Sequence, residues 1–285
     1  MPKISAGGVK LYYEEAGTGT PLLFIHEFAG DHRSWETQMR FFSRRYRAIT
    51  YSARGYPPSD VPEEVDAYSQ EVHVDDALAV LDGLKIEKAH ICGLSMGSYT
   101  SLLFGLKYPE RAISLTVAGS GYGSGKERGG WYGDLETMAN AFLQEGMAAT
   151  AEKYTVGAAR IQLRNKDPRG FEEFQQQFLK HSPKGSANTF KGVQMRRPNL
   201  LDLEDQLKKL TIPTLLMLGD EDDPGMEATL FMKQVIPTAG LEIFPKTGHA
   251  INLEEPDRFN RSLLDFLTAA ESGKWGLRDP RSIAG

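Results

Sequence analysis

A serine between two glycines, placed directly after a short apolar run, is the feature that most restricts how this chain can fold. Residues 91–97 read Ile-Cys-Gly-Leu-Ser-Met-Gly, and a helical pattern follows over residues 99–107. Glycines two positions on either side of Ser95 leave room for neighbouring backbone in a sharp turn from strand to helix. Such a turn exposes the Ser95 hydroxyl at a helix N-terminus, where the helix dipole stabilises developing negative charge. The pattern therefore predicts a strand, a strained turn and a helix that together present a nucleophile.

Two later segments supply an acid and a base after further predicted strands. Residues 215–218 form an apolar strand, and Gly219 then leads into the carboxylates Asp220, Glu221, Asp222 and Asp223. Residues 244–250 place His249 in a loop after another short strand. Because parallel strands meet at one edge of a sheet with their carboxyl ends, these side chains are expected to lie near Ser95.

The order Ser, Asp, His along the chain, with each residue after a strand, resembles the catalytic triad of the α/β-hydrolase family. Three other segments resemble the same family. Residues 22–26 end in His26 where the family builds part of its oxyanion hole, residues 51–56 are similar to its strand-four turn, and residues 249–256 are similar to its final loop. The resemblance extends over residues 9–266, with a gap in the middle of that range. The chain resembles cap-bearing serine hydrolases of the esterase, lactonase and carbon–carbon hydrolase kind.

Alternating strand and helix patterns predict an α/β fold with a mostly parallel sheet flanked by helices. Strands are expected at residues 9–15, 22–26, 46–51 and 112–118, and apolar residues recur at helical spacing over residues 70–84. From about residue 130 to residue 210 helix formers dominate, with the likeliest helices at 135–143, 148–156 and 171–179. The resemblance implies that this insertion is a helical cap. We therefore expect a core at residues 1–125 and 211–272, a cap at 126–210 and a polar tail at 273–285, either mobile or an interaction arm.

Bulk properties exclude several classes of function. A chain of 285 residues with 40% hydrophobic residues is better explained by one large domain with an insertion than by two domains. Its net charge of −5 argues against a nucleic-acid partner or an anionic membrane surface. The one cysteine, Cys92, excludes an intramolecular disulfide and a cysteine-rich metal site, and it is expected to be buried. No signal peptide or membrane span is recognisable, so a cytoplasmic protein is expected.

The resemblance implies a role for each member of the triad. Ser95 is the candidate nucleophile and His249 its general base, because a free hydroxyl is a weak nucleophile at neutral pH. The other histidines have weaker contexts: His26, His32, His73, His90 and His181. The family places its acid third after the strand-terminal glycine, which indicates Asp222, with Asp220 as the second candidate and Asp223 as the third.

Two backbone donors are expected to stabilise the tetrahedral intermediate. One is the N–H of Met96, directly after the nucleophile, and the other, by resemblance, is the N–H of Phe28. Here the chain departs from the family, which usually has glycine where this chain has Glu27. A carboxylate pointing into the oxyanion hole would oppose charge development, so Glu27 is expected to point to the surface and pair with a nearby cation.

The leading functional hypothesis is a serine hydrolase that cleaves a small carboxylic ester, with neither cofactor nor metal. Lactonase, carbon–carbon hydrolase and slow-turnover binding or receptor-type protein remain alternatives, whereas dehalogenases and epoxide hydrolases use Asp where Ser95 stands. The expected partner is a small-molecule substrate, and a homodimer is left open. Residues of the insertion that could line a pocket are Trp131, Tyr132, Met138, Phe142, Tyr154 and Phe178.

Overall fold

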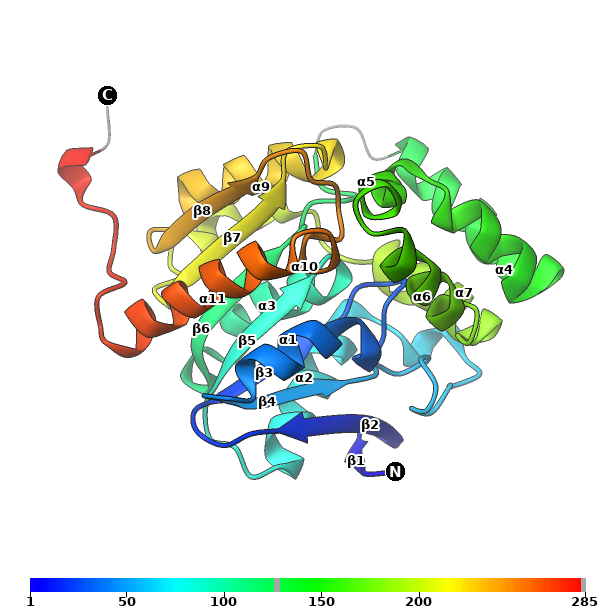
Figure 1. Cartoon of the computed structure of the whole chain (residues 1–285), viewed down its shortest axis with the longest axis horizontal. Helices are drawn as coiled ribbons and strands as arrows, with labels where there is room; N and C mark the ends of the chain where they lie inside the picture. The colour runs from blue at the N-terminus through cyan, green and yellow to red at the C-terminus, as the bar shows by residue number, and fades with distance from the viewer. Residues whose placement is uncertain (126–128, 283–285) are drawn as a thin grey trace.

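An eight-stranded sheet forms the centre of the computed structural model, which describes residues 1–125 and 129–282 (Figure 1). The strand order is β1-β2-β4-β3-β5-β6-β7-β8. The strands are β1 (Lys3–Ala6), β2 (Val9–Ala16), β3 (Pro21–Ile25), β4 (Arg47–Tyr51), β5 (Ala89–Leu94), β6 (Ala112–Ala118), β7 (Thr214–Gly219) and β8 (Ala239–Phe244). The pairs β1–β2 and β2–β4 are antiparallel, and every other pair is parallel. The predicted α/β architecture with a mostly parallel sheet is confirmed.

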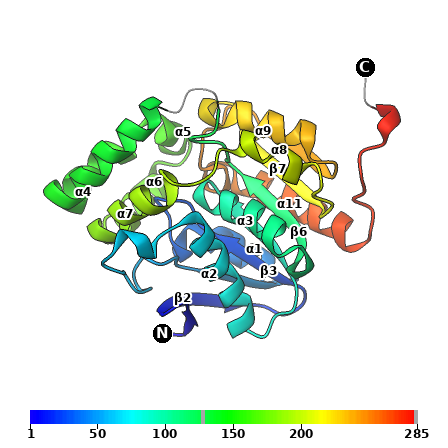
Figure 2. The same cartoon turned by 180° about the vertical axis from the view of Figure 1, so that it is seen from behind.

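Helices cover both faces of this sheet (Figures 1 and 2). The core helices are α1 (Glu36–Phe42), α2 (Gln70–Gly83), α3 (Met96–Lys107), α8 (Glu204–Leu207), α9 (Asp223–Val235), α10 (Ile251–Glu254) and α11 (Pro256–Glu271). One apolar cluster joins the sheet to α2, α3 and α9, and a second joins its other face to α1 and α11. Strand β5 supplies both clusters, because Ile91 faces the first and Cys92 the second.

Four helices between β6 and β7 gather at one end of the sheet, far from the C-terminal tail in both views (Figures 1 and 2). They are α4 (Gly129–Thr155), α5 (Ala158–Lys166), α6 (Pro168–Phe178) and α7 (Pro183–Asn188). Helix α4 is interrupted at Gly146, whose φ of 80° and ψ of −179° are not helical. The three predicted helices of this segment are thus present, with two of them inside α4. The predicted start of the insertion, residue 126, lies outside the described residues.

Two features of the chain ends differ from the expectations. Strand β1 was not expected, because four residues at the sheet edge are too short for a period-two pattern to stand out. The predicted tail is anchored at its start: the Trp275 indole N–H donates to the Thr238 carbonyl at 2.8 Å, and its ring packs 4.6 Å from that of Phe266. The last part of that predicted tail, residues 283–285, lies outside the described residues.

None of the helices within residues 1–125 and 129–282 is both long enough and apolar enough to cross a membrane.

Candidate active site

The turn between β5 and α3 places Ser95 in a conformation that side chains rarely adopt. Its φ is 54°, and its N–H donates to the Ala118 carbonyl of the adjacent strand β6 at 2.8 Å. The glycines flanking the turn are required by close backbone approach. A Cβ on Gly93 would lie 2.0 Å from the Gly97 carbonyl oxygen, and one on Gly97 would lie 2.1 Å from the Ile25 oxygen. The sequence pattern around Ser95 is therefore explained by sterics.

Asp222 and His249 meet at the carboxyl edge of the sheet. Asp222 follows β7 and directly precedes α9, and its Oδ2 lies 2.8 Å from Nδ1 of His249, which follows β8. Both side chains are buried. Burial alone would raise the pKa of the Asp222 carboxyl, but the charge and hydrogen bond of His249, with a hydrogen bond from Tyr122, hold that pKa below its ordinary value. Asp222 is thus an ionised acceptor for His249.

The three neighbouring carboxylates are exposed, and two of them bond to other residues. Asp220 accepts from the Thr247 N–H at 3.1 Å, and Glu221 accepts from the Gln162 amide of α5. Only Asp222 of this group reaches His249 among the described residues. Asp222 is therefore the candidate acid that contacts His249, and its catalytic role stays a prediction.

His249 and Ser95 border the same residue pair. Ser95 bonds to Ala118, and a Cβ on the adjoining Gly119 would lie 3.5 Å from His249 Cε1. Because His249 Nδ1 donates its hydrogen to Asp222, the other imidazole nitrogen, Nε2, is available as a base.

A second buried carboxylate holds the loop that carries His249. The two oxygens of Glu254 accept the backbone N–H of Gly248 at 2.6 Å and of Ala250 at 3.0 Å, one on each side of His249. Burial raises the pKa of Glu254, although both backbone bonds oppose that change. The sequence signal was the glutamate five residues after His249, to which no role had been attached.

The two expected oxyanion donors lie beside the turn. Met96 is the first residue of α3, so its N–H has no partner within the helix. Phe28 follows β3 in a loop whose first residue, His26, lies against Gly97 of the turn. Within the described part of the chain, neither N–H donates to another residue. Both groups are free to donate to a developing oxyanion.

His26 fixes the loop that leads to Phe28. Its Nε2 accepts from the Ala53 N–H at 3.0 Å, so the proton is on Nδ1, which donates to the Glu27 carbonyl at 2.6 Å. Burial lowers the pKa of His26 to about 4, so the ring is neutral near pH 7. The rival histidines bond to other partners: His32 to Ser52, His90 to Ser114, and His181 to Asp31.

Glu27 corrects one expectation. Its side chain is 2% exposed and does not point to the surface; it pairs with Arg160 of α5, whose side chain is 1% exposed. The expected cation exists, but it belongs to the insertion. The Arg160 guanidinium also lies 5.0 Å from the Phe174 ring centroid, so Glu27 joins the loop after β3 to the helices of the insertion. No pattern in the sequence links two residues so far apart.

Phe28 makes a second connection to the same helices. Its ring stacks on Phe190 with centroids 3.9 Å apart, and it also contacts Phe142, Tyr154 and Phe178. Three of the six residues proposed as pocket lining therefore pack directly against Phe28, in the loop after β3. Trp131 and Met138 are partly buried against the same apolar cluster, and Tyr132 contacts the Trp131 ring.

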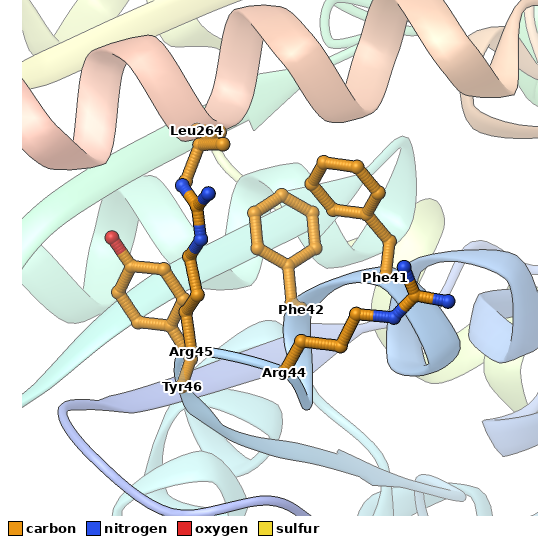
Figure 3. A pocket seen from close by; sticks show the side chains of 6 residues that line it. All are labelled: Phe41, Phe42, Arg44, Arg45, Tyr46 and Leu264. Carbon is orange, nitrogen blue, oxygen red and sulfur yellow. The ribbon is translucent and has the colours of Figure 1, made fainter.

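Two surface pockets lie away from this centre. A small pocket of about 120 Å³ is formed by the end of α1, the turn after it and one residue of α11. Figure 3 shows the side chains that line it. A larger open crevice of about 840 Å³ runs between α1, α6 and the start of α11. Neither is lined by Ser95, Asp222 or His249. Among residues 1–125 and 129–282, no cluster of three or more His, Cys, Asp or Glu side chains is arranged to hold a metal ion.

The chain is similar to known proteins over most of its length. Residues 20–256 match the family model described as alpha/beta hydrolase fold. A 3-oxoadipate enol-lactonase from Acinetobacter baylyi is 29% identical over 253 residues, covering 88% of this chain and 89% of that protein. A 2-hydroxy-6-oxononadienedioate/2-hydroxy-6-oxononatrienedioate hydrolase from Burkholderia vietnamiensis is 26% identical over 281 residues, covering 91% of each chain.

A solved structure is similar to this chain in fold. A thermophilic esterase from Thermogutta terrifontis superimposes with a TM-score of 0.84 at 26% identity, covering 94% of this chain and 98% of that one.

Proposed function

Because this chain belongs to the α/β-hydrolase fold family, we propose that it is a serine hydrolase that cleaves a small carboxylic ester through an acyl-enzyme on Ser95. The observation that carries the proposal is the buried hydrogen bond from His249 to Asp222 beside the strained turn of Ser95. A family relationship alone would not specify chemistry, because one fold hosts many activities. The arrangement of a nucleophile, a base and an ionised acid supports acyl transfer.

The proposed acylation uses these groups as follows. His249 Nε2 takes the proton of the Ser95 hydroxyl as Oγ attacks the ester carbonyl carbon, and the carbonyl oxygen becomes an oxyanion. The N–H groups of Met96 and Phe28 stabilise that charge at the N-terminus of α3. The carbon–oxygen bond to the alcohol then breaks, and the alcohol leaves with the proton from His249.

Deacylation repeats the steps with water. His249 takes a proton from water, the resulting hydroxide attacks the acyl carbon, and the bond to Ser95 Oγ breaks as His249 returns the proton to Oγ. The carboxylic acid is released and Ser95 is regenerated. Asp222 stays ionised throughout and stabilises the imidazolium that forms in each half-reaction.

A lactone is the second candidate substrate, and the enol-lactonase relative favours it. The same steps then open a ring, and the alcohol group that is formed stays joined to the acyl group through its carbon chain. Water then releases both groups as one hydroxy acid. Carbon–carbon hydrolysis is a further alternative supported by the relative that acts on 2-hydroxy-6-oxononadienedioate.

We assign the choice of acyl group to helices α4–α7 and Phe190. Aromatic side chains of α4 and α6, together with Phe190, pack on Phe28, so the part of the roof that lies over Phe28 is apolar. An apolar roof that excludes water strengthens the hydrogen bonds to an oxyanion and favours uncharged acyl groups of modest size.

The proposed function is tested with an active-site probe and a substrate panel. A fluorophosphonate should label the wild-type protein at Ser95, located by peptide mass, and the Ser95→Ala protein should stay unlabelled. Aryl esters of increasing acyl length, simple lactones and dienoate-type diketones then distinguish the candidate reactions by turnover. Labelling at another serine in Ser95→Ala, or equal hydrolysis by both proteins, would contradict the proposal.

A further inference from the structure

The Asp222 carboxylate has a second partner, which the sequence pattern did not identify. Tyr122 donates its hydroxyl hydrogen to Asp222 Oδ1 at 2.8 Å, while Oδ2 receives His249 Nδ1 at 2.8 Å. Among the described residues, these are the only two hydrogen bonds to the carboxylate, so no backbone N–H orients it. The orientation of the Asp222 carboxylate therefore depends on Tyr122 and His249 alone among the described residues.

Tyr122 also contacts the imidazole. The ring centroids of Tyr122 and His249 are 4.6 Å apart at an angle of 60°, an edge-to-face contact. One side chain thus touches both the acid and the base. The phenol can only donate here, since burial first and the Asp222 carboxylate second raise the pKa of Tyr122 far above its ordinary value.

The loop that carries Tyr122 is held from several directions. Its carbonyl accepts the Tyr99 hydroxyl of α3 at 3.2 Å and the Arg197 guanidinium. The neighbouring glycines Gly121 and Gly123 have positive φ angles of 127° and 70°. A Cβ on Gly121 would lie 2.9 Å from the Gly225 Cα, so the loop presses against the start of α9. The glycine-rich run at residues 119–125 is thus held by contacts with α3, Arg197 and the start of α9.

We propose that Tyr122 is a positioning residue of the catalytic centre, whose hydroxyl holds the Asp222 carboxylate so that its other oxygen orders His249. This inference rests on the proposed function, because it requires Asp222 to act on His249. Without the hydroxyl, Oδ1 is a buried acceptor with no donor. The carboxylate then rotates, or its hydrogen bond with the His249 imidazole changes in strength.

The Tyr122→Phe protein tests this role because it keeps the ring and its contact with His249. We expect kcat on an aryl ester to fall ~10–100-fold, the effect of losing one hydrogen bond to a charged group, with little change in KM. The acid limb of the kcat/KM profile should move to higher pH, since Asp222 without the phenol becomes a stronger acceptor and holds the proton on the His249–Asp222 pair more tightly. Ser95 labelling should slow in parallel.

The matched control is Tyr99→Phe, which removes a hydroxyl from the same loop anchor without touching Asp222. It should retain the wild-type pH profile. The low-field proton resonance of the His249–Asp222 hydrogen bond should shift in Tyr122→Phe and stay in Tyr99→Phe, a readout that needs no substrate.

Three outcomes separate the two proposals. Unchanged kcat, pH profile and resonance in Tyr122→Phe, with Ser95→Ala inactive, would overturn the role of Tyr122 alone. Identical losses in Tyr122→Phe and Tyr99→Phe would also overturn it, because loop anchoring would then explain both. Full activity in Ser95→Ala would overturn the proposed function instead.

Discussion

At the scale of single residues, burial separates Asp222 from the carboxylates around it. Asp220, Glu221 and Asp223 are exposed, and each belongs to the same short run of acids. Solvent stabilises their charges without help from His249. Asp222 is 2% exposed and is stabilised as an anion by two specific donors. This difference predicts unequal effects of one chemical change made along the run.

Asp222→Asn should lower kcat by roughly 10³–10⁴-fold, because an amide facing Nδ1 favours the wrong imidazole tautomer. Asp220→Asn and Asp223→Asn are the controls, and each should change kcat by no more than about twofold, as exposed substitutions usually do. Steady-state turnover of all three proteins, with far-UV circular dichroism to verify folding, gives the comparison. A crippling Asp220→Asn would mean that the acid had been assigned to the wrong residue.

The triad candidates could be located from the sequence because each lies within a short local signal. Ser95 has its two glycines, and His249 follows a glycine in a loop after a strand. Tyr122 and Arg160 carry no such signal, because their partners are 100 and 133 positions away along the chain. Contacts over such separations depend on the packing of helices on the sheet, which one sequence does not specify. The catalytic roles of Ser95, Asp222 and His249 remain predictions.

At the scale of elements, the pair Glu27–Arg160 joins the loop after β3 to helix α5. Two charges removed from water need each other, since an unpaired buried charge is costly. The orientation of Glu27 was predicted wrongly because the helix that supplies its partner lies in the insertion, where the family resemblance is weakest. Without a recognisable partner in the sequence, the Glu27 carboxylate was expected at the surface.

Glu27→Gln should lower the free energy of unfolding by ~3–5 kcal/mol, because it leaves Arg160 buried without a counter-charge. The double variant Glu27→Gln/Arg160→Met should recover most of that loss, since no buried charge remains. Urea unfolding of the two single variants, the double variant and the wild type yields the coupling free energy.

The matched control for this pair is Glu145→Gln on α4, which breaks the exposed ion pair with Lys153. Its effect should stay below ~1 kcal/mol, the usual range for surface pairs. Equal effects of Glu27→Gln and Glu145→Gln would show that the buried pair contributes no more than an exposed one.

At the scale of the whole molecule, two buried histidines make stability depend on pH. Burial lowers the pKa of His26 to about 4 and that of His73 to about 3. In the unfolded chain both rings titrate near pH ~6.5. Between these values the unfolded chain binds more protons than the folded protein, so the free energy of unfolding falls as pH drops from ~6.5 towards ~4.

Each histidine should contribute a loss of roughly 2 kcal/mol between pH 7 and pH 5. His73→Phe should flatten this dependence by about one such contribution, because a phenyl ring fills similar space and does not titrate. His73 suits the test since its Nε2 has no hydrogen-bond partner among the described residues. Urea unfolding of both proteins at pH 7 and pH 5 provides the measurement, and equal slopes would contradict the prediction.

The overall architecture was predictable because strand and helix alternate with clear periods along most of the chain. The parallel core from β3 to β8 follows apolar runs bounded by glycine and proline, and the helical end of the molecule follows helix formers over about eighty residues. The edge strand β1 and the anchoring of Trp275 on β8 could not be predicted, because each depends on a few residues meeting a distant surface.

The burial of Cys92, the one cysteine of the chain, makes its thiol a chemical probe of core opening. The thiol lies in the centre of β5, has no exposed surface, and is shielded by helices on the second face of the sheet. Maleimides reach this thiol only when the helices that cover this face of the sheet have moved away from β5. Labelling of Cys92 by a maleimide is therefore blocked in the folded protein. The rate of labelling measures how often the core opens.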